Sequence, residues 1–109
     1  MTNEIVTAIV EHRDGYKVCE RARKEIVQMD KDKASFGLLR GAQLVEKAKD
    51  YRKELGNLHF IVSEFDNLMS FIFPLKDNHS LILALEPHMQ EFKTFVTDVK
   101  EIIKKHNLQ

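Results

Sequence analysis

Five histidines are the first side chains in this sequence to weigh for chemistry, because a neutral imidazole binds metal ions and titrates near neutral pH. They are His12, His59, His79, His88 and His106. No two of them are four residues apart, the spacing at which one helix face presents two histidines to a metal. His79 and His88 could meet only if the fold brought two distant segments together. We therefore expect no metal site, although His59 could respond to pH if it lies at an interface.

Nucleophilic and cofactor chemistry also lacks a supporting pattern. Cys19 stands beside Glu20 and Arg21, but no histidine or asparagine partner for a thiol nucleophile is evident. The four glycines match neither the dinucleotide-binding fingerprint nor the phosphate-binding P-loop. Four carboxylates fall at expected turns and strand ends, namely Glu64, Asp66, Asp77 and Glu86. We predict a protein that is not an enzyme and that binds no cofactor.

Composition limits the class of protein. With 109 residues, 43% of them apolar and 31% charged, the chain suits one globular domain spanning 1–109. The 17 basic and 17 acidic residues cancel, whereas a nucleic-acid-binding domain normally carries a basic excess. One cysteine cannot form an intrachain disulfide, which fits a reducing cytoplasm. The longest stretch without a charge, 67–75, is far too short for a membrane helix, so we expect no direct membrane insertion.

The elements that position these side chains begin with a hairpin. Residues 5–13 are rich in β-branched side chains, which favour a strand, and Asp14-Gly15 indicates a tight turn before a second strand that begins at Tyr16. The polar stretch 21–33 fits a loop, a strand extension or a short helix. Three more short strands follow, separated by polar turns, at 58–65, 68–75 and 80–85. Such short connections imply an antiparallel meander.

A long central helix is predicted between the hairpin and the meander. Asp32 or Ser35 can cap it, and Gly56 is expected to stop it after Leu55. At 100° per residue, one side is apolar and is predicted to be buried, with two glycines that allow close packing: Gly37, Leu38, Gly41, Leu44, Val45, Ala48, Tyr51 and Leu55. Phe36 and Leu39 fall on the polar side, where they either need a partner or are isolated surface residues.

The last helix is expected to open at Pro87, whose missing N–H costs nothing at a helix start. Its apolar stripe includes Phe92, Phe95, Val96, Val99, Ile102 and Ile103. The whole order is strand–strand–helix–strand–strand–strand–helix. This order predicts an α+β fold with helices packed on a single five-stranded antiparallel sheet.

Two segments of the sequence resemble the Roadblock/dynein light chain family, whose fold is profilin-like. AIVEHRDGYKV looks like the opening hairpin of that family, and LHFIVSEFDNLMSFIFPLKDNHSLILAL resembles its final three-strand meander. The predicted helices at 32–55 and 91–105 fall where the family has its central and last helices. The resemblance departs at the N-terminus, because only four residues precede Ile5 where the family usually carries another helix. The profilin and longin folds have a similar sheet.

The resemblance implies a non-enzymatic dimerisation module in the cytoplasm. Such a module would be a scaffold, adaptor or regulator for a small Ras-like GTPase or for a larger signalling or motor complex. Family members pair through the central helix and the third strand, so the partner here would be a second copy or a related Roadblock-like chain. Carried over by position, the dimer interface comprises Phe36, Leu39, Arg40, Gln43, Lys47, His59, Ile61 and Ser63. The alternatives are a small-ligand sensor domain, which needs a cavity between sheet and helix, and a profilin-like or longin-like binding module.

Overall fold

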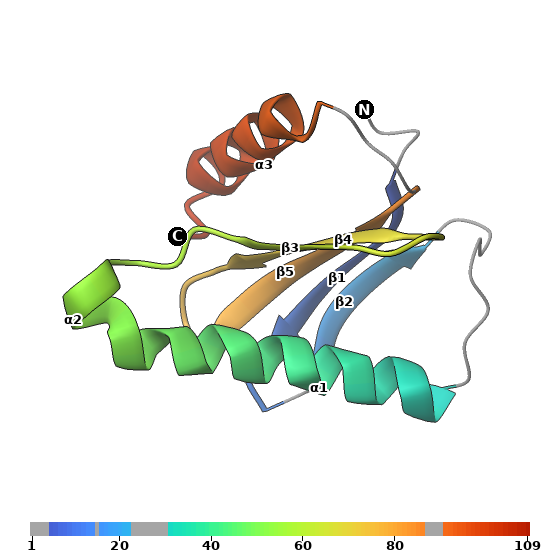
Figure 1. Ribbon diagram of the computed structural model, residues 1–109, viewed down its shortest axis with the longest axis horizontal. Coiled ribbons are helices and arrows are strands. Elements are labelled where there is room, and N and C mark those ends of the chain that lie inside the picture. The colour runs from blue at the N-terminus through green and yellow to red at the C-terminus, as the bar shows by residue number, and fades with distance from the viewer. Residues whose placement is uncertain (1–4, 15, 23–30, 87–90) are drawn as a thin grey trace.

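The computed structural model is built on five antiparallel strands in one sheet, with helices on both faces (Figure 1). It describes the backbone of residues 5–14, 16–22, 31–86 and 91–109, and the side chains of 7–14, 16–21, 40–86 and 91–109. In chain order the elements are β1 (Ile5–His12), β2 (Lys17–Ala22), α1 (Lys31–Ala48), the 3-10 turn η2 (Lys49–Tyr51), α2 (Arg52–Leu55), β3 (Ile61–Glu64), β4 (Met69–Pro74), β5 (His79–Leu85) and α3 (Phe92–Lys105). The strands lie in the order β2-β1-β5-β4-β3. The predicted fold class and element order are confirmed.

The turns of the meander form where the sequence predicts them. The Phe65 N–H donates to the Leu68 carbonyl at 2.7 Å and closes the turn between β3 and β4. Between β4 and β5, Asp77 and Asn78 have φ values of 58° and 62°. Two successive left-handed residues make the hairpin turn whose twist matches that of the flanking strands, and aspartate and asparagine tolerate this conformation. The glycine predicted for the first hairpin, Gly15, lies outside the described residues.

The central helix differs from its prediction at several points. α1 begins at Lys31, so neither Asp32 nor Ser35 stands before it as a cap. α1 ends at Ala48, and η2 and the four residues of α2 separate it from Gly56. Gly56 does end the helical segment, with a φ of 84° that favours glycine. The first predicted strand of the meander is also too long, because 57–60 carry no strand. Pro87 lies outside the described residues.

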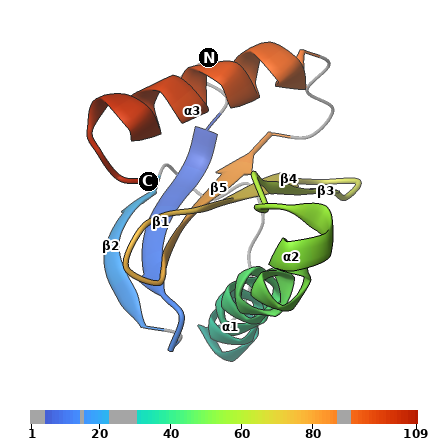
Figure 2. The same ribbon diagram turned by 90° about the vertical axis from the view of Figure 1, so that its left-hand side faces the viewer.

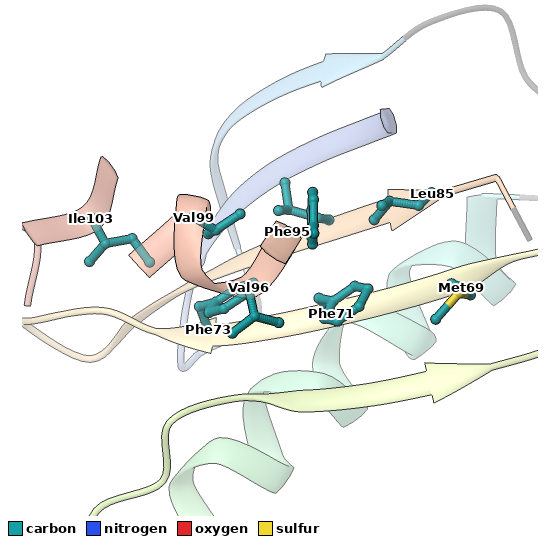
Figure 3. Packing of buried hydrophobic residues seen from close by; sticks show 9 residues of the cluster. Met69, Phe71, Phe73, Leu85, Phe95, Val96, Val99 and Ile103 are labelled. Atoms are coloured by element: carbon teal, nitrogen blue, oxygen red, sulfur yellow. The ribbon is translucent and has the colours of Figure 1, made fainter. Parts of the chain in front are cut away.

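The main core lies between the sheet and α3 (Figure 3). Phe71 of β4 is fully buried, and its ring centroid is 5.1 Å from that of Phe95 in α3 and 6.2 Å from that of Phe73. The predicted apolar stripe of α3 is confirmed for its central part, whereas Ile102 is 50% exposed. The cluster consists of Met69, Phe71, Phe73, Leu83, Leu85, Phe95, Val96, Val99 and Ile103. This core holds α3 on the sheet, and α1 lies on the opposite face (Figure 2).

The packing of α1 against its sheet face depends on a glycine. Gly41 is buried, and a Cβ atom added there would lie 3.0 Å from Cδ1 of Ile72 in β4 and 3.8 Å from Cδ1 of Ile82 in β5. The predicted close approach is therefore confirmed at Gly41. The surroundings of Gly37 lie outside the described side chains.

We expect the substitution Gly41→Val to lower the free energy of unfolding by about 1–3 kcal/mol, because the added methyl groups must displace Ile72 or lift the helix. Glu101→Val places the same side chain at an exposed position of α3, outside the predicted interface, and should cost only a few tenths of a kcal/mol, about the usual propensity difference. Urea unfolding followed by circular dichroism measures both. Equal stability of the two variants would show that the glycine does not limit the packing.

Candidate interaction surface

Three large apolar side chains of the central helical segment are exposed, contrary to the sequence prediction. Leu44 is 54% exposed, Tyr51 55% and Leu55 80%. Their spacing of seven and four residues places them along one side of a helix. The prediction of burial is wrong because α1 meets the sheet through a narrow strip around Gly41 and Val45, which cannot cover a wider apolar face. We call Leu44, Tyr51 and Leu55 the apolar flank.

The apolar flank faces the side of the sheet on which β3 lies. On the other side of the helical segment, Lys49 donates from Nζ to Oδ1 of Asn78 in the β4–β5 turn at 2.9 Å. The Asn78 carbonyl in turn accepts the N–H of Arg13, beside the end of β1, at 2.8 Å. The Lys49 side therefore points toward β5 and β1, and the opposite side points toward β3. Figure 2 accordingly shows α1 beneath the part of the sheet away from β2.

Among the described residues, β3 is an edge strand, with β4 as its one strand neighbour. It pairs with β4 from Ile61 opposite Ile72 to Glu64 opposite Met69, and no described strand lies along its other side. Val62 is 42% exposed, and Phe65, just after the strand, is 62% exposed. An apolar flank and an open strand edge thus occur on the same side of the molecule.

The opposite edge, β2, carries features that discourage pairing with another chain. Lys17 and Glu20 form an exposed ion pair with 3.1 Å between Nζ and Oε1, and Arg21 adds a further charge. The pairing register with β1 shifts between Val10 and Glu11, and such a bulge twists a strand locally. β3 has a single charged residue, so it is the less protected of the two edges.

Five residues of the interface predicted from the resemblance lie on α1 or on the α1 face of β3. Arg40, Gln43 and Lys47 are exposed on α1 and line, together with Leu44, an open hollow of about 760 Å³. Glu46, Asp50 and Arg13 line the same hollow, which therefore also reaches the end of β1. Ile61 and Ser63 are half-buried on the α1 face of β3, because Ile61 pairs with Ile72, which contacts that helix. The side chains of Phe36 and Leu39 lie outside those described.

The sequence pattern predicts that His59 faces the same side of the strand as Ile61 and Ser63, and the structure places it differently. It precedes β3 in a segment without strand pairing. Its Nδ1 lies 3.0 Å from Nζ of Lys100, which belongs to α3 on the other face of the sheet. His59 therefore faces the α3 side of this edge.

Glu11 is a buried acidic residue that the sequence analysis did not single out. Its side chain is 0% exposed on the α1 face of β1, opposite the buried Ser80 of β5. Within the described part of the chain, neither carboxylate oxygen has a hydrogen-bond partner. Burial raises the pKa of Glu11 to about 7, because the charged form loses its hydration. The sequence did contain a sign of this burial. Glu11 comes two positions after Ile9, and residues two apart in a strand face the same side of the sheet.

Two of the candidate histidines have a neighbour that the sequence did not indicate. The rings of His12 and His79, at paired positions of β1 and β5, meet edge to face with centroids 5.0 Å apart, and Tyr16 stacks on His12 at 4.8 Å. His88 lies outside the described residues. Among the side chains that are described, no three histidines, cysteines or carboxylates form a group suited to a metal ion. No helix in that part of the chain is both long and apolar enough to span a bilayer.

Comparison with solved structures identifies the fold. The chain is similar to a Roadblock/LC7 domain from Streptomyces avermitilis, with a TM-score of 0.60, 14% identity and coverage of 93% of this chain and 87% of that one. The gliding protein MglB from Thermus thermophilus gives a TM-score of 0.61 at 11% identity, over 75% of this chain and 61% of that chain. MglC from Myxococcus xanthus gives 0.53 at 16% identity, over 88% and 80% of the two chains.

These similarities define the class of protein by its architecture. No protein-family model matches the sequence, and no curated protein matches it either. At identities of 11–16% the likeness is one of fold. The chain has the Roadblock/LC7 fold, which confirms the fold that its hairpin and meander segments predict.

Proposed function

We propose that this protein is a non-enzymatic dimerisation module, in which α1 and β3 of two copies meet across a twofold axis. The observation that carries the proposal is the apolar flank beside the open edge of β3. A soluble protein gains by covering such a patch, and an exposed strand edge is a template for pairing with another strand. A second copy can cover the apolar flank and pair with β3 at the same time, because a twofold contact places the same surface on each side.

The energetic contribution of this contact comes from its apolar part. Burying a leucine or tyrosine side chain that is half-exposed contributes on the order of 1 kcal/mol, and the apolar flank occurs twice in a symmetric dimer. Pairing of β3 with its copy adds backbone hydrogen bonds along this edge. Arg40, Gln43 and Lys47 border the flank and supply the polar rim that interfaces commonly have.

Introducing a charge in the apolar flank should separate the two copies. We expect the unaltered protein to show twice the mass of one chain by light scattering at tens of micromolar. Leu44→Glu should give the mass of one chain, through a loss of affinity of about 100-fold or more, because the contact would have to remove a carboxylate from water, a cost that pairing with Arg40 or Lys47 does not repay. A similar result is expected for Leu39→Glu if that side chain reaches the same surface.

Ile102→Glu is the matched control, because Ile102 is 50% exposed on α3 at the other face of the sheet. This variant should keep the dimer mass. An unaltered protein that is monomeric at the same concentration, or equal dissociation by Leu44→Glu and Ile102→Glu, would contradict the proposed surface. Circular dichroism shows whether each variant keeps its secondary structure.

The dimer would then act as a scaffold, adaptor or regulator for a small Ras-like GTPase or a larger complex in the cytoplasm. The resemblance of the hairpin and meander to the Roadblock family supports this role, together with the fold. The role requires positioning of a partner and no catalytic group from this chain. Ras-like GTPases of the same organism, loaded with a fluorescent GTP analogue, test it: the unaltered dimer should change the polarisation or the rate of nucleotide release, and the Leu44→Glu monomer should not.

A further inference from the structure

A pocket lies at the sheet edge where β4 extends beyond β3. β3 pairs with β4 only as far as Ile61 and Ile72, whereas β4 continues to Pro74. Residues 57–60 approach β3 without strand pairing, so the last two residues of β4 lack a strand on that side in the described structure. The space between this edge and the ends of the helices has a volume of about 400 Å³. That volume falls within the range of small-molecule sites.

The floor of the pocket is apolar. Phe73 and Ile103 lie at its base, but at 1% and 4% exposure they offer a ligand almost no surface of their own. Figure 3 shows both side chains at the same end of the core, between β4 and α3. The other apolar lining residues are Val45, which is buried, and the half-buried Ala48, Leu58, Pro74 and Leu75. Such a floor can receive the hydrocarbon or aromatic body of a ligand. It is continuous with the hydrophobic core between the sheet and α3, to which Phe73 and Ile103 belong.

The rim of the pocket is positively charged. It carries Lys49, Arg52, Lys76 and Lys100, the other polar lining residues are Asn57, His59 and Gln109, and no aspartate or glutamate is among them. Lys49 is already engaged, because its Nζ lies 2.8 Å from Oε1 of Glu46. Within the described residues, no carboxylate pairs with any of the other three cations. The chain as a whole is neutral, so this excess of positive charge is a local feature.

Two side chains lie close to the ammonium group of Lys100. Its Nζ lies 3.0 Å from Nδ1 of His59 and 5.9 Å from the ring centroid of Phe60. An ammonium group can only donate, so Nδ1 of His59 is the acceptor in this contact. The histidine and the aromatic ring orient the cation without cancelling its charge. The ammonium therefore remains available to an anion at the rim.

We propose that this pocket binds a small organic anion, with its acidic head group against Arg52, Lys76 and Lys100 and its apolar body against Leu58 and Leu75. Phosphate and carboxylate share the chemistry that these cations recognise, and arginine can bind either with two parallel hydrogen bonds. This function is separate from dimerisation, because none of the five residues belongs to the apolar flank or to β3.

Titration with 1-anilinonaphthalene-8-sulfonate, an aromatic monoanion that fluoresces in apolar surroundings, tests the proposal on the full chain. We expect one saturable site per chain and at least tenfold weaker binding of the uncharged analogue N-phenyl-1-naphthylamine. Octyl phosphate and octanoate should displace the dye, and the tighter competitor identifies the preferred head group. Octanol should displace it at least tenfold less well than that competitor, because it lacks the charge.

Single substitutions then locate the site. Arg52→Gln and Lys76→Gln should each weaken dye binding about tenfold, the usual effect of losing one charge-assisted hydrogen bond. Arg21→Gln on β2 and Lys105→Gln at the end of α3 make the same charge changes at exposed positions outside the pocket and should leave binding unchanged. The amide chemical shifts of 57–59, Leu75 and Lys76 should move on addition of octyl phosphate.

Several results would overturn the proposal. They are the absence of a saturable site, equal binding of the uncharged analogue, failure of both anionic competitors to displace the dye, and equal weakening by the control variants. Shift changes confined to the apolar flank would place the ligand elsewhere and would overturn it as well. None of these results depends on whether the protein dimerises, since the Leu44→Glu variant can be titrated in the same way.

Discussion

Glu11→Gln should make the protein more stable at pH 8, by up to about 3 kcal/mol, and should remove most of the pH dependence of its unfolding between pH 5 and pH 8. Burial raises the pKa of this carboxyl from 4.5 to about 7 in the folded state, and each unit corresponds to about 1.4 kcal/mol. The folded protein therefore holds the proton more tightly than the unfolded chain does. The free energy of unfolding should fall as the pH rises from about 4.5 to about 7, and then level off.

Urea unfolding at pH 5 and pH 8, at one fixed protein concentration, measures this effect in the unaltered protein and in the variant. Glu101→Gln makes the same change at an exposed position of α3 and should alter stability by no more than about 0.5 kcal/mol at either pH. If the unaltered protein is equally stable at both values, or if Glu11→Gln is the less stable chain at pH 8, Glu11 is not a buried charge without a partner.

Phe71→Ala should lower the free energy of unfolding by about 3–5 kcal/mol, a large part of the roughly 5–15 kcal/mol that stabilises a typical domain. Phe71 is fully buried, and its ring lies against Phe95 of α3 at a centroid distance of 5.1 Å. Its removal leaves a cavity between the sheet and α3 that neighbouring side chains cannot fill without leaving their preferred rotamers.

The control is Phe65→Ala, because Phe65 is 62% exposed just after β3 and should cost no more than about 1 kcal/mol. Denaturant midpoints for the two variants at equal protein concentration give the comparison. A loss below about 1 kcal/mol for Phe71→Ala would mean that α3 contributes little to holding this face of the sheet together.

The sequence was sufficient to predict most of the fold. Alternating or continuous apolar runs predict the five strands, polar turns separate them, and the spacing of Phe95, Val96, Val99 and Ile103 predicts the buried face of α3. Gly56 was correctly expected to stop the central helical segment. These features depend on residues close together in the chain, where backbone preferences and side-chain periodicity act directly.

The interaction surface was predicted less well. Leu44, Tyr51 and Leu55 share a side with Gly41 and Val45 in the helical pattern, so they were expected to be buried, and the structure exposes them. Periodicity identifies the apolar side of a helix, but the width of the strip that is covered depends on how the helix lies on its sheet. The residues carried over from the family resemblance, Arg40, Gln43 and Lys47 among them, remain a prediction that the Leu44→Glu experiment tests.

What the sequence by itself determined is the set of strands, turns and helices and their assembly into one antiparallel sheet. Only the tertiary structure decided that Glu11 is buried, that the apolar flank is exposed, and that Arg52, Lys76 and Lys100 surround one pocket. The physical reason is the range of the interactions. Backbone conformation follows from neighbours in the chain, whereas burial and charge environment are set by segments that meet only when the chain has folded.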